Sequence, residues 1–522
     1  MKNYTSIFIK KILNILFLTI LLCSSCELLK VQPEKTPSAG VRIFSANPWD
    51  AKNSFGLNEF VARALEGKQD IIKLDGFGND WLVWGAVVDV DEEMVLETEL
   101  EGADNLKSPI DIKVAGEVLI KNKGGDEWRF DPLFKSCKSL GDLSKYIKNW
   151  DVIKDFPLLH LKPRNPCLLW VTVNTRDITS GKCKGAIALR RGKKVVAKMP
   201  VEVSVSPVNL PEDNPIIGYT WTHYGDDESL AKLLHDYGFN ACGYYDNWDM
   251  LKKVGFRFFK FNVPPCSWNR ASLKAGDDEV RYYLKSIQDD IKRLGLKENE
   301  WAIEIFDEPV DPNAEIFVAW MEKIKRIWPA ARFFANPGYS GTNKVFATIK
   351  GTVEPLKENV KVWCPYMAYL YQKSDFMSEL KKTGNPIWFY TIEYAHQKSS
   401  AGGRQLPWLA WRDRLDGWAF YALKEYGKDN PWTDNVCGRM FPGSTVSIWL
   451  EGLRQGVQDY KRLWLLRQHG LSCEQIDSEI IKVTPKGDDS PWGGAEPEVY
   501  RLARAKLDEM VKENSRSLQT HF

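Results

Sequence analysis

Residues 301–309 read Trp301-Ala302-Ile303-Glu304-Ile305-Phe306-Asp307-Glu308-Pro309, a largely apolar run that ends in two acidic residues and a proline. An apolar run of this length predicts a strand buried on both faces, as in a parallel sheet covered by helices. Further runs of the same character occupy residues 216–221, 239–245, 256–263, 332–336, 360–366, 386–392 and 417–423. Helical patterns, in which apolar residues recur three and four positions apart, lie between them at 228–237, 278–294 and 315–327.

Eight apolar runs that alternate with helices predict an α/β fold, a closed (β/α)8 or TIM barrel over residues 216–470. An open doubly wound sheet is the structural alternative. No GxGxxG or GxxxxGK[ST] loop is present, so the usual nucleotide ligands of such a sheet have no support. Two further helical patterns, at 446–468 and 496–513, predict a C-terminal helical segment, residues 471–522, packed on the barrel.

The chain before residue 207 has a different pattern. Residues 41–206 are rich in short β-branched and aromatic runs separated by Gly, Asp and Pro, which predicts a β-sandwich domain before the barrel. Arg191-Gly192-Lys193 predicts a hairpin turn, and the Pro- and Asn-rich residues 207–215 predict a linker.

The N-terminus predicts a targeting signal. Lysines 2, 10 and 11 precede an apolar run at 12–22, which is too short for a convincing membrane span. Residues 1–26 resemble a bacterial lipoprotein signal peptide that leaves Cys26 as the lipidated N-terminus, with residues 27–40 as a tether. A plain secretory signal is the alternative. We therefore expect an exported bacterial lipoprotein, periplasmic or attached to the outer membrane, whose membrane contact is its lipid anchor.

The composition excludes some classes of partner. A formal net charge of +2 over 522 residues, with no long basic run, argues against nucleic acid. The cysteines after Cys26 lack a CxxC pair or neighbouring histidines, so neither a metal site nor a cofactor is expected. The chain also has 21 Trp and 19 Tyr, and aromatic rings of this kind serve both as core and as surfaces for sugars.

Asp307 and Glu308 are the candidate catalytic residues because the reactive side chains of a TIM barrel follow the carboxyl ends of its strands. Other Asp-Glu pairs lie in turns or at helix ends, starting at residues 91, 126, 227, 278 and 508. The alternative for Asp307 is a cap for the helix expected near Asn313. Adjacent carboxylates repel each other as anions, so one of them is expected to keep its proton and serve as an acid.

This pair suits the cleavage of an acetal, which needs a proton for the leaving oxygen and negative charge near the developing cation. A retaining enzyme with its own nucleophile holds two carboxylates about 5 Å apart across the sugar, and neighbours on one strand rarely face each other in that way. An adjacent pair therefore favours one carboxyl as acid and base, and the other as a group that orients a nucleophile of the substrate, such as a 2-acetamido oxygen.

The sequence resembles glycoside hydrolase family 123 and its related catalytic domains, together with their N-terminal β domain. The resemblance covers residues 216–466 and rests on Phe306-Asp307-Glu308-Pro309, Trp388-Phe389-Tyr390-Thr391, Leu415-Asp416-Gly417-Trp418 and Glu451-Gly452-Leu453-Arg454-Gln455-Gly456-Val457-Gln458-Asp459-Tyr460. It implies retaining exo-hydrolysis of β-linked N-acetylgalactosamine by substrate assistance. In that scheme Asp307 stabilises the acetamido group and Glu308 is the general acid and base.

Two alternatives remain open. Glu393 follows the seventh strand, across the barrel mouth from Glu308, so a covalent mechanism with Glu393 as nucleophile competes with substrate assistance. The second alternative is a lipoprotein that binds a glycan without cleaving it.

The sequence also departs from the family at two positions. Tyr421 stands where Trp is common, and Trp449 stands where Arg is common.

Other strand ends supply candidate substrate-binding residues, for each of which core packing or a surface position is the alternative. These residues are Trp221, His223, Tyr245, Asn336, Tyr366, Tyr390 and Trp418.

Overall fold

The computed structural model describes a mixed α/β protein. The described residues are 40–50, 70–102, 110–120, 127–137, 140–243, 247–264, 276–340, 345–369, 374–392, 402–423, 440–442, 445–484 and 496–519.

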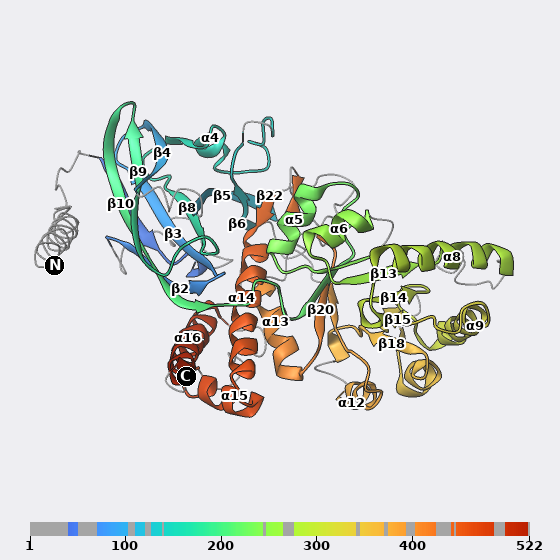
Figure 1. Ribbon diagram of the computed structural model, residues 1–522. Coiled ribbons are helices and arrows are strands. Elements are labelled where there is room, and N and C mark those ends of the chain that lie inside the picture. Colours follow the sequence, from blue (N-terminus) through green and yellow to red (C-terminus); the bar gives the residue numbers. More distant parts are fainter. Residues whose placement is uncertain are drawn as a thin grey trace, which may run out of the picture. The chain divides into compact units, whose positions relative to one another are not determined.

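Two sheets dominate the first part of the chain, and both contribute buried side chains to the same large hydrophobic cluster (Figure 1). The seven-stranded sheet runs in the order β1 (Val41–Ala46), β3 (Trp81–Val90), β8 (Cys167–Asn174), β5 (Ile110–Ile120), β6 (Glu127–Phe134), β22 (Thr445–Ser447) and β21 (Met440–Phe441). The five-stranded sheet runs in the order β2 (Ile72–Gly78), β10 (Lys194–Asn209), β9 (Gly181–Arg191), β4 (Met94–Gly102) and β7 (Leu158–Leu161).

The β-rich part confirms one sequence prediction and differs from the sequence predictions in two other details. The hairpin predicted at Gly192 is confirmed, since Gly192 has a φ of 61° between β9 and β10. Strand β10, however, continues into the predicted linker because Asn209 pairs with Gly78. Strand β22 comes from far later in the chain and pairs with β6 through Val446 and Leu133, so this part is not built from one contiguous segment.

A sheet of eight parallel strands occupies the second part of the chain. Its order is β18 (Val360–Trp363), β15 (Phe333–Ala335), β14 (Trp301–Glu304), β13 (Phe258–Asn262), β12 (Ala241–Gly243), β11 (Ile217–Thr220), β20 (Gly417–Tyr421) and β19 (Tyr390–Ile392). Each strand falls within one of the apolar runs described above. Parallel bridges join Trp363 to Ile387 and Tyr366 to Tyr390, so the two end strands of this order are also paired.

Helices alternate with these strands along the chain. The longer ones are α5 (Glu228–Asp236), α6 (Trp248–Val254), α8 (Asp277–Leu294), α9 (Asp311–Ile327), α12 (Ser374–Lys382), α13 (Gly402–Asp413), α14 (Ile448–Gln468), α15 (Cys473–Ile481) and α16 (Pro497–Gln519). None of the described helices combines the length and apolar character needed to cross a membrane. Shorter pieces are η2 (Pro48–Asp50), α4 (Trp150–Ile153), η3 (Glu298–Glu300), β16 (Tyr339–Ser340), β17 (Val345–Phe346), η4 (Ile349–Val353) and α10 (Glu354–Leu356).

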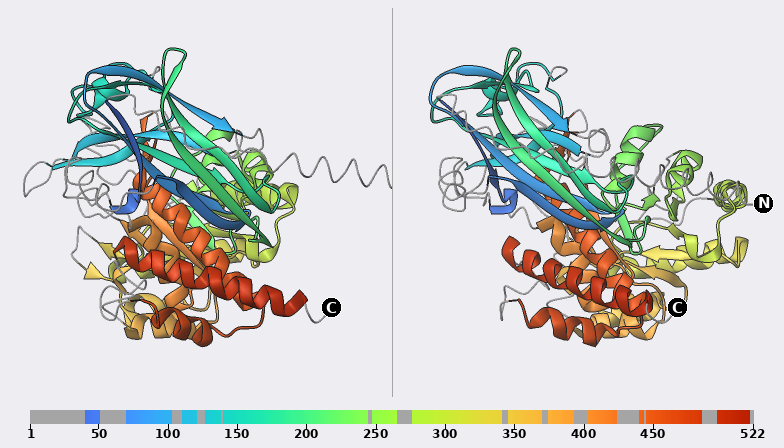
Figure 2. Two further views of the ribbon diagram at one scale, coloured as in Figure 1. Left: turned by 90° about the vertical axis from the view of Figure 1, so that its left-hand side faces the viewer. Right: turned by 60° about the vertical axis from the view of Figure 1, so that its left-hand side comes forward.

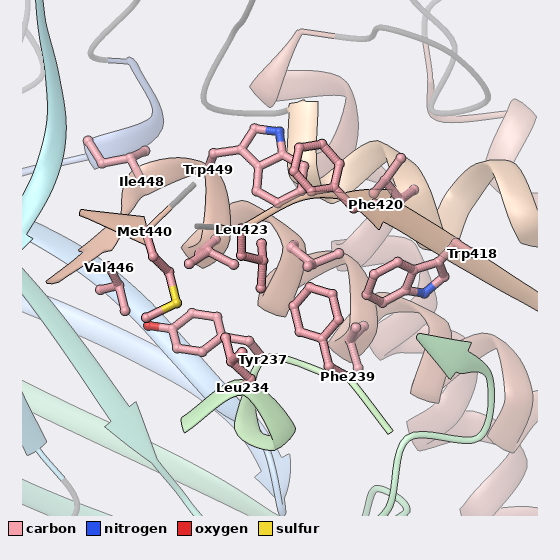
Figure 3. Close-up of a cluster of buried hydrophobic side chains, with 14 of the residues drawn as sticks. Leu234, Tyr237, Phe239, Trp418, Phe420, Leu423, Met440, Val446, Ile448 and Trp449 are labelled. Atoms are coloured by element: carbon pink, nitrogen blue, oxygen red, sulfur yellow. The ribbon is translucent and has the colours of Figure 1, made fainter. Parts of the chain in front are cut away.

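Side chains on the two faces of the eight-stranded sheet enter different hydrophobic clusters, because successive residues of a strand point to opposite sides. One face forms a small cluster that includes Tyr219, Phe258, Phe334, Trp388 and Tyr390. The other face packs against helices, and Figure 3 shows one such region, where strand β20 meets the end of α5, strands β21 and β22, and the first turn of α14. Its labelled side chains are Leu234, Tyr237, Phe239, Trp418, Phe420, Leu423, Met440, Val446, Ile448 and Trp449.

Helix α14 connects the two parts of the chain through buried ionic groups. Glu451, fully buried, accepts hydrogen bonds from Lys113 of β5 at 3.2 Å and from the Tyr237 hydroxyl at 2.7 Å, and it also pairs with Arg454. Farther along the helix, Arg462 pairs with Asp80 at the turn between β2 and β3. Helices α14 and α16 lie side by side in both views of Figure 2.

A second buried group joins α14 to its helical neighbours. Asp459 accepts from Arg404 of α13 at 2.7 Å and from Arg504 of α16 at 2.5 Å. The stretch 451–460, which carried part of the family resemblance, therefore holds elements together, and it lies in the core rather than at the strand ends that bear Asp307 and Glu308.

We expect Glu451→Ala to reduce the free energy of unfolding by about 3–5 kcal/mol, because it leaves the buried charges of Lys113 and Arg454 without their carboxylate. Chemical denaturation monitored by circular dichroism measures this. Arg501→Ala is the matched control, since its ion pair with Glu498 is half exposed, and it should change little. An equally small effect of Glu451→Ala would contradict the proposed role of this network.

The same network predicts loss of stability in acid. Burial acts to raise the pKa of Glu451, but Arg454 and Lys113 outweigh it and hold that pKa below the usual value. A lowered folded-state pKa stabilises the protein fully above the ordinary carboxyl pKa of about 4, and this contribution disappears as the pH falls below it. Unfolding temperatures measured from pH 7 to pH 3 should therefore fall less steeply for Glu451→Gln than for the parent. Parallel curves would disprove the assignment.

Candidate active site

The acidic pair lies just beyond the carboxyl end of β14, in the loop before α9. Asp307 is exposed and Glu308 is half buried. Glu308 has a φ of 52°, a left-handed backbone conformation that non-glycine residues adopt rarely and at some cost. Helix α9 begins at Asp311 without a side-chain cap, so Asp307 is not used as the helix cap that was its alternative role.

Asn336, which follows β15, holds both acidic residues. Its Nδ2 donates to Oδ1 of Asp307 at 2.6 Å, and its Oδ1 accepts from the backbone amide of Glu308 at 3.2 Å. With 1% of its surface exposed, Asn336 is itself fixed by its surroundings. The sequence predicted a sugar-binding role for this residue, whereas the hydrogen bonds show that it fixes the Asp307 carboxylate and the backbone of Glu308.

Tyr390 of β19 reaches the pair from the other side. Its hydroxyl donates to Oε1 of Glu308. Burial raises the pKa of Tyr390 well above its usual value, and the neighbouring charge of Glu308 raises it further. The phenol therefore keeps its proton at any working pH and remains a donor to the Glu308 carboxylate.

Gly338 provides the space in which Tyr390 and Glu308 meet. A Cβ at this position would overlap the Tyr390 hydroxyl and would lie 2.7 Å from Oε1 of Glu308. The hydroxyl of Tyr369 fixes this segment by donating to the carbonyls of Gly338 and Ala347, at 3.1 Å in each case. Glycine is thus required here for its lack of a side chain.

Aromatic rings gather at the same edge of the sheet, since parallel strands bring their carboxyl ends together. Trp221 follows β11, and its ring centroid lies 5.6 Å from that of Tyr390 and 6.1 Å from that of Tyr421. Tyr366, which follows β18, lies 5.3 Å from Tyr390. The structure therefore brings together six of the predicted residues, and Tyr421 joins them. The six are Asp307, Glu308, Asn336, Trp221, Tyr366 and Tyr390.

The remaining predicted residues do not join this group. Trp418 points to the opposite face of β20, where it packs against Phe239 with no exposed surface, so core packing explains it (Figure 3). His223 is exposed on the loop after Trp221. Tyr245 and Glu393 lie outside the described residues, as does Cys26.

Sequence reasoning missed a buried ion pair on the face of the eight-stranded sheet that carries the small cluster around Tyr219. Lys260 of β13 pairs with Glu304 of β14, which also accepts from Asn262 at 2.9 Å. Lys260 has no exposed surface, and its ammonium lies 5.2 Å from the ring centroid of Tyr219. A charged residue inside an apolar strand, as in Phe258-Phe259-Lys260-Phe261, was the signal available for this pair.

The arrangement offers two carboxylates at one edge of a rigid sheet, with aromatic rings beside them. Such a group can deliver and accept a proton and can place negative charge near a reacting centre. Within the described residues no cluster of His, Cys, Asp and Glu is arranged to hold a metal ion.

Comparison with known proteins relates the fold to carbohydrate enzymes. No family model matches the chain, and no curated protein matches it. A solved family 123 glycoside hydrolase from Clostridium perfringens, described for its hydrolysis of glycolipid glycans, is similar with a TM-score of 0.61 at 12% identity. The similarity covers 92% of this chain and 99% of that chain. The two chains share one fold.

Other solved structures are more distant. A family 39 glycoside hydrolase from Bacteroides cellulosilyticus WH2 has a TM-score of 0.36 at 10% identity, over 75% of this chain and 82% of that chain. An endo-beta-1,4-mannanase from Thermotoga petrophila has a TM-score of 0.34 at 12% identity, over 48% and 77%.

Gly338→Ala tests the packing of the candidate site. The new methyl group must displace Tyr390 or Glu308, and a displacement of about 1 Å near reacting groups costs on the order of 100-fold in rate. Turnover of an accepted substrate should fall by that factor, measured together with the unfolding temperature. Gly276→Ala is the matched control, because a Cβ there meets no atom within 4 Å. Equal rates for both variants would show that Glu308 does not need Tyr390.

Proposed function

We propose that the protein is a retaining exo-glycoside hydrolase that removes a terminal β-linked N-acetylgalactosamine, or a related 2-acetamido sugar, from glycans. The observation that carries the proposal is the joint fixation of Asp307 and Glu308 by Asn336 and Tyr390 at the carboxyl edge of a parallel sheet. The shared fold with a family 123 glycoside hydrolase supports it.

The proposal includes the architecture. We infer a (β/α)8 barrel, with the bridges between the end strands β18 and β19 in support. We also infer that the strands of the two preceding sheets that come from residues 41–206 form a β-sandwich domain, and that α15 and α16 form the C-terminal helical segment. We also propose the lipoprotein signal with Cys26 as the lipidation site, and hence a periplasmic or outer-membrane location, on the sequence pattern alone.

In the proposed mechanism, the substrate supplies its own nucleophile. Glu308 in its acid form protonates the glycosidic oxygen while the acetamido oxygen attacks the anomeric carbon, and the bond to the leaving group breaks. Asp307 accepts the acetamido N–H and balances the positive charge of the cyclic intermediate. Glu308, now a carboxylate, takes a proton from water as that water attacks the anomeric carbon and opens the ring.

Each positioning contact has a role in this scheme. The Asn336 hydrogen bond to Oδ1 fixes the plane of the Asp307 carboxylate toward the substrate. Tyr390 holds Oε1 of Glu308, so the other oxygen can carry the transferred proton. The rings of Trp221, Tyr366 and Tyr421 can pack on the apolar faces of a sugar.

Aryl β-glycosides, with the N-acetylgalactosaminide among them, test the activity. Glu308→Gln should lower turnover by about 10²–10⁴-fold, as expected for loss of a general acid and base. Asp307→Asn should lower it by about 10²–10³-fold, as expected for loss of one electrostatic stabiliser. Glu322→Gln, an exposed carboxylate of α9, is the control and should leave the rate unchanged. Sugar binding without turnover in the parent would instead favour a glycan-binding lipoprotein.

The alternative mechanism uses Glu393, the residue after Ile392 in the sequence, as a covalent nucleophile. Under substrate assistance, Glu393→Ala stays active and a thiazoline analogue of the sugar inhibits the enzyme. Under the covalent scheme, Glu393→Ala is inactive until azide is added, and the thiazoline does not inhibit.

A further inference from the structure

A cavity lies where α13, α14 and the start of α15 meet. Its volume is about 230 Å³, and its walls include Trp411, Tyr460, Trp464, Arg414, Arg467 and Gln468. Typical pockets for drug-sized ligands measure roughly 300–1,000 Å³. The cavity therefore suits a smaller ligand of about one ring.

This cavity is separate from the candidate active site. Leu415, another of its wall residues, comes just before β20 (Gly417–Tyr421) in the chain. The candidate site lies beyond the carboxyl end of that strand, where Tyr421 approaches Trp221. Five strand residues at about 3.3 Å each span roughly 16 Å, so one sugar ring cannot occupy both places.

Of the three aromatic side chains that line the cavity, Trp411 and Tyr460 contact each other, whereas Trp464 is positioned to contact a ligand. Trp411 is buried, its indole N–H donates to Asp477 at 2.8 Å, and its ring meets Tyr460 edge-on at 6.0 Å. Trp464 is half buried and belongs to none of the hydrophobic clusters formed by the described residues. A large indole that does not contribute to a core and faces a cavity indicates a surface for a ligand.

The charges around the cavity favour a neutral ligand. Arg414 pairs with Asp477 at 2.6 Å. A hydrogen bond from the backbone of Glu474 and one from Ser472 lower the pKa of the Glu474 carboxyl, and Arg414 and Arg467 add to this effect, so both arginines have an anion nearby. Arg467 and Gln468 are exposed and offer planar polar groups beside the Trp464 indole. Aromatic faces combined with planar donors and acceptors match the alternating CH faces and hydroxyls of a sugar.

We propose that this cavity is a second carbohydrate-binding site, which takes one neutral pyranose ring of a glycan. The ring packs its CH face on Trp464, and Arg467 and Gln468 bind its hydroxyls. The choice of a glycan as ligand rests on the proposed function, whereas the position and shape of the site do not. The site would hold a long or surface-bound glycan near the enzyme without taking part in the chemistry.

Fluorine NMR of the full chain containing 5-fluorotryptophan tests the proposal. The resonance that is missing from Trp464→Phe belongs to Trp464. It should shift and saturate when β-linked tetrasaccharides of glucose, galactose, N-acetylglucosamine or N-acetylgalactosamine are titrated. Trp464→Ala lacks this resonance, so its affinity is measured by isothermal titration calorimetry. It should bind the responding tetrasaccharide about tenfold more weakly than the parent and turn over aryl glycosides at an unchanged rate. Tyr282→Ala removes a ring that is 72% exposed on α8 and is the matched control.

The outcomes separate this proposal from the hydrolase assignment. A Trp464 resonance that stays unmoved with all four sugars overturns the second site, whether or not the protein is an active hydrolase. A saturating Trp464 response without any aryl glycoside turnover supports the second site and overturns the hydrolase. Unfolding temperatures of Trp464→Ala and the parent should agree, and equal calorimetric affinities of the two proteins for the responding tetrasaccharide also overturn the site.

Discussion

The buried ionic side chains of α14 are the constraint on which the rest of the structure depends. A charge removed from water is strongly unfavourable unless a partner of opposite charge meets it. Glu451 meets Lys113 of the seven-stranded sheet, Arg462 meets Asp80 from the turn between β2 and β3, and Asp459 meets arginines of α13 and α16. Apolar contacts alone would tolerate sliding, whereas these pairs fit in one arrangement. The β-rich part, the helices and the eight-stranded sheet are therefore held in one relation.

The candidate site likewise combines an unfavourable feature with specific contacts that hold it in place. Glu308 adopts an uncommon backbone conformation, and it is held by Asn336, which follows the neighbouring strand β15, and by Tyr390 of the more distant strand β19. The absence of a side chain at Gly338 lets these groups meet. The buried Lys260–Glu304 pair joins β13 to β14 on the sheet face that carries the small aromatic cluster around Tyr219. A carboxylate held in this way has little freedom to reorient, as the proposed proton transfer by Glu308 requires.

Particular residues show where sequence reasoning succeeded and where it stopped. The apolar runs located all eight strands, and the position of Asp307 and Glu308 after the fourth run marked the pair. Trp418 was assigned to the same edge because it lies on the eighth strand, but its side chain faces the helices. Asn336 was expected to bind sugar, and the structure adds its hydrogen bonds to the acidic pair, which the sequence did not indicate. Local patterns place a residue on a strand but do not reveal its neighbours.

The sequence by itself determined the strand and helix order, the hairpin at Gly192 and the acidic pair, because each depends on short-range periodicity or on one backbone conformation. Tertiary structure alone decided which side chains meet. Tyr390 and Glu308 are 82 positions apart, and Lys113 and Glu451 are 338 apart. Such contacts depend on strand register, on the face each side chain points to and on how distant segments dock. Those are properties of the packed chain, and no local run of residues encodes them.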